Sequence, residues 1–149
     1  MGRAALFLQS ASATDAELMQ RWRFANALMY TVRGNPVTYY GDEQGFIGTG
    51  GDQLARQDMF ASQVEIYNGE KVLGGASGPM NRYRTNHPFY RWLHELAEWR
   101  SRHPALADGA QINRHAAESA GIFAISRFDR RADTEYLVVA NNATTAQSA

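Results

Sequence analysis

The residues best suited to chemistry stand in one short stretch of the chain. Asp42 and Glu43 are adjacent carboxylates that follow a run rich in β-branched and aromatic residues. Paired carboxylates are the groups that cleave glycosidic bonds. Adjacent strand residues point to opposite faces, however, so this pair is not expected to face one substrate as acid and nucleophile. Structural hydrogen bonding by both carboxylates is an equally good interpretation.

A second pair follows, with Asp52 and Arg56 four residues apart. A carboxylate beside a guanidinium offers acceptors and donors together, which suits a hydroxyl-rich ligand such as a sugar. A structural ion pair explains the same spacing equally well. The sequence leaves both interpretations open.

Two further patterns are weaker. His94 to Glu98 approaches the zinc-protease motif His-Glu-x-x-His, but a Glu stands where the second His is needed. Gly48 to Asp52 is rich in glycine, but it lacks the Gly-Lys-Ser/Thr ending of a phosphate loop. We therefore predict neither a metal site nor a nucleotide site in this chain.

The elements that position these residues begin with a helix. Thr14 and Glu17 form a capping box, and apolar residues recur at helical spacing up to a stop at Gly34, so a helix is expected over Asp15 to Arg33. Residues 36–40 then predict a short buried strand. The glycine-rich stretch 41–51 is a loop beyond the end of that strand, where ligand sites of α/β proteins concentrate.

The second half of the chain changes in character. Residues 61–86 show no sustained period and predict a long irregular excursion. A helix is expected over 88–103, with Thr85 or Asn86 as its cap. Three short strands, antiparallel rather than α/β, are then expected near 111–115, 121–128 and 135–142, so a domain boundary is placed near residue 108.

Composition excludes several classes of protein. The chain has 149 residues, 44% of them hydrophobic, with 15 basic and 15 acidic side chains and no cysteine. A nucleic-acid binder would carry a basic excess, and a membrane protein would carry a long apolar run. We expect neither nucleic acid nor a membrane as a partner. No targeting segment is recognised, and the localisation stays open.

Several segments together resemble one known family. Residues 33–45, from Arg33 to Gly45, closely resemble the eighth-strand segment of the α-amylase family, glycoside hydrolase family 13, although Asn35 stands where an aliphatic residue is usual. The likeness extends over 50–60 and resumes over 87–106, which is similar to the last barrel helix. The segments 121–127 and 135–142 resemble strands of the β domain that follows the barrel.

The resemblance implies an α/β fold class: the C-terminal portion of a (β/α)8 TIM barrel over 1–107, followed by an incomplete antiparallel β-sandwich domain over 108–149. It implies a retaining glycosidase acting on α-glucosidic bonds of starch or maltooligosaccharides. The Asp nucleophile, the Glu acid/base and a further Asp come from the fourth, fifth and seventh strands in that family. All three are expected upstream of this chain, so no catalytic residue is assigned here and the isolated chain is predicted to be inactive.

The resemblance also implies substrate contacts. Asp52 and Arg56 match loop residues that line glucose sites. Residues 1–3 fit the short segment with an Arg that, in the family, commonly follows the Asn-His-Asp motif of the third catalytic carboxylate, which places Arg3 near the mouth of the site. No cofactor is expected in this chain, and calcium ligands of a full-length parent would lie mainly upstream. The expected partners are an α-glucan and the missing N-terminal part of the barrel. The alternative is a non-catalytic carbohydrate-binding or structural remnant.

Overall fold

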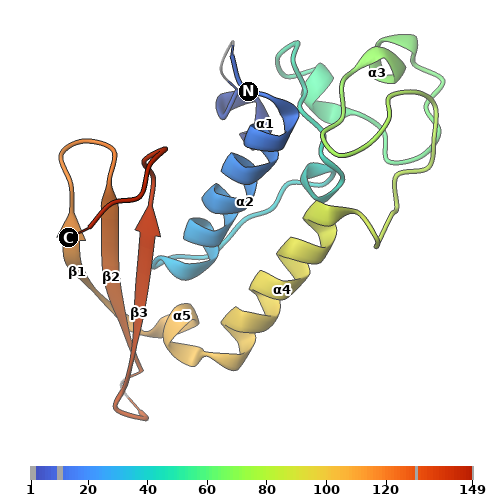
Figure 1. Ribbon diagram of the computed structural model, residues 1–149. Helices are drawn as coiled ribbons and strands as arrows, with labels where there is room; N and C mark the ends of the chain where they lie inside the picture. Colours follow the sequence, from blue (N-terminus) through green and yellow to red (C-terminus); the bar gives the residue numbers. More distant parts are fainter. Residues whose placement is uncertain (1–2, 10–11, 130, 149) are drawn as a thin grey trace. The chain divides into compact units, whose positions relative to one another are not determined.

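The computed structural model describes residues 3–9, 12–129 and 131–148, and the chain divides into two compact units. Unit 1 comprises Met1–Ala27 and Val37–Leu96, and unit 2 comprises Leu28–Pro36 and Ala97–Ala149. Figure 1 labels the α-helices and strands. The described elements are, in chain order, α1 (Ala4–Phe7), α2 (Asp15–Thr31), the short 3-10 helices η1 (Asp42–Gln44) and η2 (Leu54–Arg56), α3 (Glu65–Gly69), α4 (Pro88–Arg102), α5 (Pro104–Asp108), β1 (Ala110–Ala116), β2 (Ile122–Asp129) and β3 (Thr134–Asn141).

The predicted capping box at the start of α2 is confirmed. The Thr14 amide donates to Glu17 Oε2 at 2.7 Å, and the Glu17 amide donates to Thr14 Oγ1 at 3.2 Å. Two amides that the helix itself cannot satisfy are thereby paired. None of the described helices is long and apolar enough to cross a membrane.

The core of unit 1 forms where the first parts of α2 and α4 meet. The Trp22 and Phe89 rings stack with centroids 3.8 Å apart and planes at 11°. The Trp92 indole N–H donates to the Arg23 carbonyl at 3.0 Å, which adds a hydrogen bond between α4 and α2. Stacked aromatic pairs stabilise a core beyond their buried area.

His87 joins the irregular segment to the start of α4. Its Nδ1 accepts from the Phe89 amide at 3.2 Å, so the proton lies on Nε2, which donates to the Leu73 carbonyl at 3.1 Å. His87 therefore caps the helix, and the expected caps Thr85 and Asn86 are not used. The sequence did not indicate this, because a histidine is not among the preferred capping residues.

The buried strand expected over residues 36–40 is not formed in this chain. The segment belongs to no strand, and Val37 is 78% exposed. A parallel strand is buried only where neighbouring strands pair with it and helices cover the sheet. None of the described strands pairs with this segment, and residues 37–40 stay exposed. The excursion at 61–86 is irregular as predicted, apart from the short helix α3.

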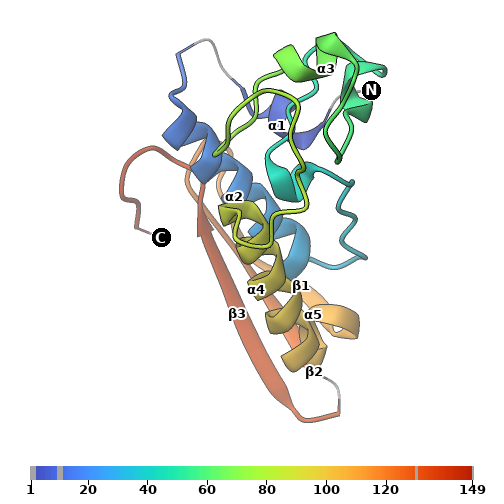
Figure 2. The same ribbon diagram turned by 90° about the vertical axis from the view of Figure 1, so that its right-hand side faces the viewer.

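Unit 2 contains the three predicted strands, which form an antiparallel sheet in the order β1-β2-β3, with a register shift between Asn113 and His115 in β1. Figure 1 shows the strands side by side, with β2 in the middle, and Figure 2 shows the sheet nearly edge-on. Helix α5, which the sequence did not predict, packs against β2 and β3.

Two arginines of unit 2 bind the end of α2. Arg127 Nη1 donates to the Thr31 carbonyl at 2.6 Å, and Arg100 Nη1 donates to the Tyr30 carbonyl at 2.8 Å. The last carbonyls of a helix have no partner within the helix, and cations complement the negative end of its dipole. Burial lowers the pKa of Arg127, with the neighbouring charges of Arg100 and Arg33 acting in the same direction.

The burial of His87 predicts that the folded chain loses stability in acid. Burial lowers the pKa of His87 below its ordinary value, although the hydrogen bond to Leu73 opposes the shift. The unfolded chain takes up a proton near pH 6.5, which the folded chain does not yet bind, so stability falls as pH drops below about 6.5. Urea unfolding should show a slope of up to about 1.4 kcal/mol per pH unit there.

His87→Gln should remove that slope and lower the stability at neutral pH. His94→Gln, which changes an exposed histidine on α4, is the matched control and should keep it. An unchanged slope in His87→Gln would contradict the assignment.

Candidate functional site

A buried ion pair lies at the base of the candidate site in unit 1. Arg3 Nη1 contacts Asp42 Oδ1 at 3.0 Å and donates to the Tyr40 carbonyl at 2.6 Å. The Arg3 side chain is fully buried, and that of Asp42 is nearly so. This contact joins the N-terminal segment to the η1 turn across 39 residues of sequence.

Aromatic rings surround the Arg3 guanidinium. Its Cζ lies 4.9 Å from the Tyr39 ring centroid, 5.2 Å from that of Tyr40 and 5.0 Å from that of Phe46. Ring faces attract a cation at such distances. They cannot replace hydrogen bonds, and Arg3 Nε and Nη2 have none among the described residues.

Burial also sets the protonation behaviour of Asp42. It raises the pKa of Asp42, and the Arg3 charge and hydrogen bonds from Arg3 and the Tyr39 amide only partly offset that effect. The Tyr39 amide donates to Asp42 Oδ2 at 3.3 Å. Asp42 thus makes structural contacts, in agreement with the interpretation of the Asp42–Glu43 pair as structural hydrogen-bonding groups.

Glu43 has a structural contact as well. Its Oε2 accepts from the Gly41 amide at 2.8 Å, which closes the tight turn that leads into η1. Gly41 has φ +86°, and a Cβ there would lie 2.2 Å from the Phe46 ring. No other residue fits this position without displacing that ring. Both carboxylates thus accept hydrogen bonds that shape this turn.

Asp52 and Arg56 form the expected pair at the surface. Arg56 Nη2 contacts Asp52 Oδ2 at 2.6 Å, and both side chains are more than half exposed. Such a pair adds little to stability. It presents a carboxylate and a guanidinium to solvent on the segment that carries η2, and the remaining atoms of both groups are available to a ligand.

The three residues assigned from sequence to the sugar site line one pocket. We call it the Arg3 pocket; it has a volume of about 450 Å³ and is lined by Arg3, Ala4, Tyr39, Asp42, Asp52, Ala55 and Arg56. Pockets of this size hold small ligands. Tyr39 and Asp42 are lining residues that were not assigned to sugar contact.

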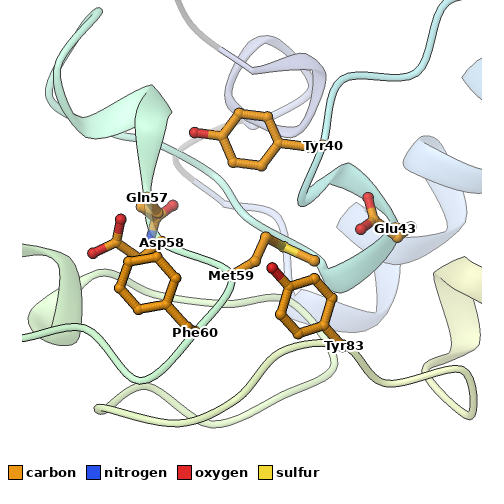
Figure 3. Close-up of a pocket in the computed structure, with 7 residues that line it drawn as sticks. All are labelled: Tyr40, Glu43, Gln57, Asp58, Met59, Phe60 and Tyr83. Carbon is orange, nitrogen blue, oxygen red and sulfur yellow. The ribbon is translucent and has the colours of Figure 1, made fainter.

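A second pocket of about 480 Å³ lies in the same unit, and we call it the Tyr40 pocket. Its lining side chains, shown in Figure 3, are Tyr40, Glu43, Gln57, Asp58, Met59, Phe60 and Tyr83. The sequence did not single it out, because its residues come from three separate segments and form no motif.

The weaker motifs gain no support. Glu98 forms an ion pair with Arg102 at 2.8 Å on the surface of α4. Among residues 3–9, 12–129 and 131–148, no group of three His, Cys, Asp or Glu side chains is placed to hold a metal ion.

Comparison with known proteins identifies the family. No protein-family profile matches the chain. An α-amylase of Streptomyces lividans is 51% identical over 152 aligned residues, which cover 100% of this chain and 16% of that protein. A β/α-amylase of Paenibacillus polymyxa is 28% identical over 116 residues, which cover 76% of this chain and 8% of that protein.

A solved structure agrees on the fold. Eubacterium rectale Amy13B superimposes with a TM-score of 0.64 over 96% of this chain and 28% of that one, at 20% identity. The resemblance drawn from the residue pattern is confirmed: this chain is homologous to a segment of an α-amylase. It spans about one sixth of the length of its Streptomyces relative.

Breaking the buried ion pair should lower the free energy of unfolding far more than breaking the exposed one. Arg3→Met leaves the buried Asp42 carboxylate without its cation, and such a loss costs about 3–5 kcal/mol. Arg56→Met breaks the exposed pair with Asp52 and should cost less than about 1 kcal/mol. Unfolding in urea measures both, and similar losses in the two variants would contradict a structural role for the buried pair.

Proposed function

We propose that this chain is the C-terminal barrel segment and the first β-domain strands of an α-amylase-type retaining glycosidase that acts on α-glucosidic bonds of starch or maltooligosaccharides. The observation that carries the proposal is the Arg3 pocket. Three residues assigned to sugar contact from sequence, Arg3, Asp52 and Arg56, lie around one cavity. The 51% identity to an α-amylase segment supports the substrate class.

The role of the pocket is substrate binding rather than bond cleavage. Asp52 supplies acceptors and Arg56 donors for sugar hydroxyls, while Arg3 holds the η1 turn beneath them through Asp42. Retaining hydrolysis needs a nucleophile and an acid/base about 5–5.5 Å apart. Asp42 and Glu43 do not serve, since both are engaged in turn contacts. The catalytic carboxylates belong to the upstream part of the parent.

The alternative is a non-catalytic carbohydrate-binding or structural remnant. It rests on the same pocket, because sugar contacts need no catalytic carboxylate. Retention of the chain on a starch column separates a binding module from a purely structural one.

The isolated chain should release no reducing ends from starch. The covalent step and the protonation of the leaving group both require carboxylates that this chain does not provide. A reducing-sugar assay on the purified chain measures this. Turnover that disappears in Asp42→Asn or Glu43→Gln would overturn the proposal.

In the full-length parent, Asp52→Ala and Arg56→Ala should each raise the KM for maltooligosaccharides by about tenfold, because a hydrogen bond to a charged group contributes about 1.5 kcal/mol or more. Steady-state kinetics on maltooligosaccharides of defined length give the measurement. Arg102→Ala, which removes an exposed ion pair on α4, is the control and should leave KM unchanged. Unchanged kinetics in both pocket variants would remove Asp52 and Arg56 from the site.

A further inference from the structure

The Tyr40 pocket is large enough for a ligand of its own. It is an open cleft with a volume of about 480 Å³, similar to that of the Arg3 pocket, and it shares no lining residue with that pocket. Pockets with apolar walls and a few convergent polar groups are typical of small-molecule sites.

The charge of this pocket has one sign. Glu43 and Asp58 are acidic, and none of its seven lining residues is basic. The Arg3 pocket, in contrast, has two arginines opposite two aspartates. A cleft lined by one sign of charge concentrates ligands of the opposite sign.

Three side chains of the pocket, those of Glu43, Gln57 and Asp58, offer hydrogen-bond acceptors. Gln57 is 2% exposed, and its Oε1 has no hydrogen-bond partner in the part of the chain that the structure describes. Glu43 and Asp58 each use one oxygen, to accept from the Gly41 amide and from the Ser62 hydroxyl at 2.6 Å. A buried acceptor without a donor costs free energy, so a ligand that brings N–H groups is favoured.

Aromatic rings form the rest of the wall. Tyr40, Phe60 and Tyr83 are 42%, 58% and 67% exposed. Figure 3 shows these three rings around the Met59 side chain, with the carboxylates of Glu43 and Asp58 on opposite sides. Ring faces attract ammonium groups, and a thioether packs well against an apolar body. The Tyr40 ring already has one cation, the Arg3 guanidinium, near it.

We propose that the Tyr40 pocket binds a small organic ammonium ion, with its N–H groups directed to the acceptors and its apolar body against the rings. This site is separate from the proposed sugar pocket and does not depend on it. The excess of negative charge attracts an ammonium ion from a distance but not a neutral polyhydroxyl ligand, so the charge of the ligand discriminates between the two pockets.

The test compares benzylammonium with benzyl alcohol, which has nearly the same shape and no charge. Each is titrated at low salt into the isotope-labelled full chain, and amide shifts at Asp58 to Phe60 give the Kd. Benzylammonium should bind at least about tenfold more tightly, since ion pairing and cation–π contact act together in a cleft partly removed from water.

Glu43→Gln and Asp58→Asn should each weaken benzylammonium binding by about threefold or more and leave benzyl alcohol unaffected. Asp52→Asn removes the same charge from the other pocket and should change neither Kd. The amide spectrum shows whether each variant is folded. If one of the two variants does not fold, the other still tests the proposal. Equal affinity for the two probes, or an ammonium preference that survives in every folded pocket variant, would overturn the proposal.

Discussion

The burial of one arginine governs the arrangement of unit 1. A guanidinium removed from water needs both a counter-charge and polar partners. Arg3 finds them in Asp42 and in the Tyr40 carbonyl, on a turn 37 to 39 residues further along the chain. Because satisfying the cation requires this turn, the backbone there is held in one conformation. Both pockets then follow, since Tyr39 and Asp42 line one, and Tyr40 and Glu43 line the other.

The rest of unit 1 supports that turn from behind. Phe46 packs against Arg3 and forms a bridge with Val72, while the Leu73 amide donates to the Gly45 carbonyl at 2.9 Å. His87 then holds the Leu73 carbonyl from the start of α4. These successive contacts connect the start of α4 to the irregular segment and to the η1 turn. Backbone polar groups removed from water need partners, and the Leu73 amide and carbonyl both have one here.

The sequence predicted the regular elements well, since their signals are local. The capping box at Thr14 specifies the start of a helix without distant partners. The strand at 36–40 failed because a parallel strand depends on neighbours that lie elsewhere. Arg3, Asp52 and Arg56 could be grouped only through the family resemblance, as their spacing says nothing of a shared cavity. Gln57 and Tyr83 gave no signal at all, because a pocket built from separate segments has no pattern in sequence.

The division of the chain into units has a consequence for cutting it. The polypeptide passes from unit 1 to unit 2 after Ala27, returns after Pro36 and crosses again after Leu96. Two of these crossings lie inside α2 and α4. No single break in the backbone therefore separates the two units cleanly. A break after Leu96, for example, leaves residues 28–36 of unit 2 on the fragment that carries unit 1. A break between residues 107 and 108 would part Arg127 from the Thr31 carbonyl that it binds. The two fragments would have to bind each other without a covalent link to restore that contact.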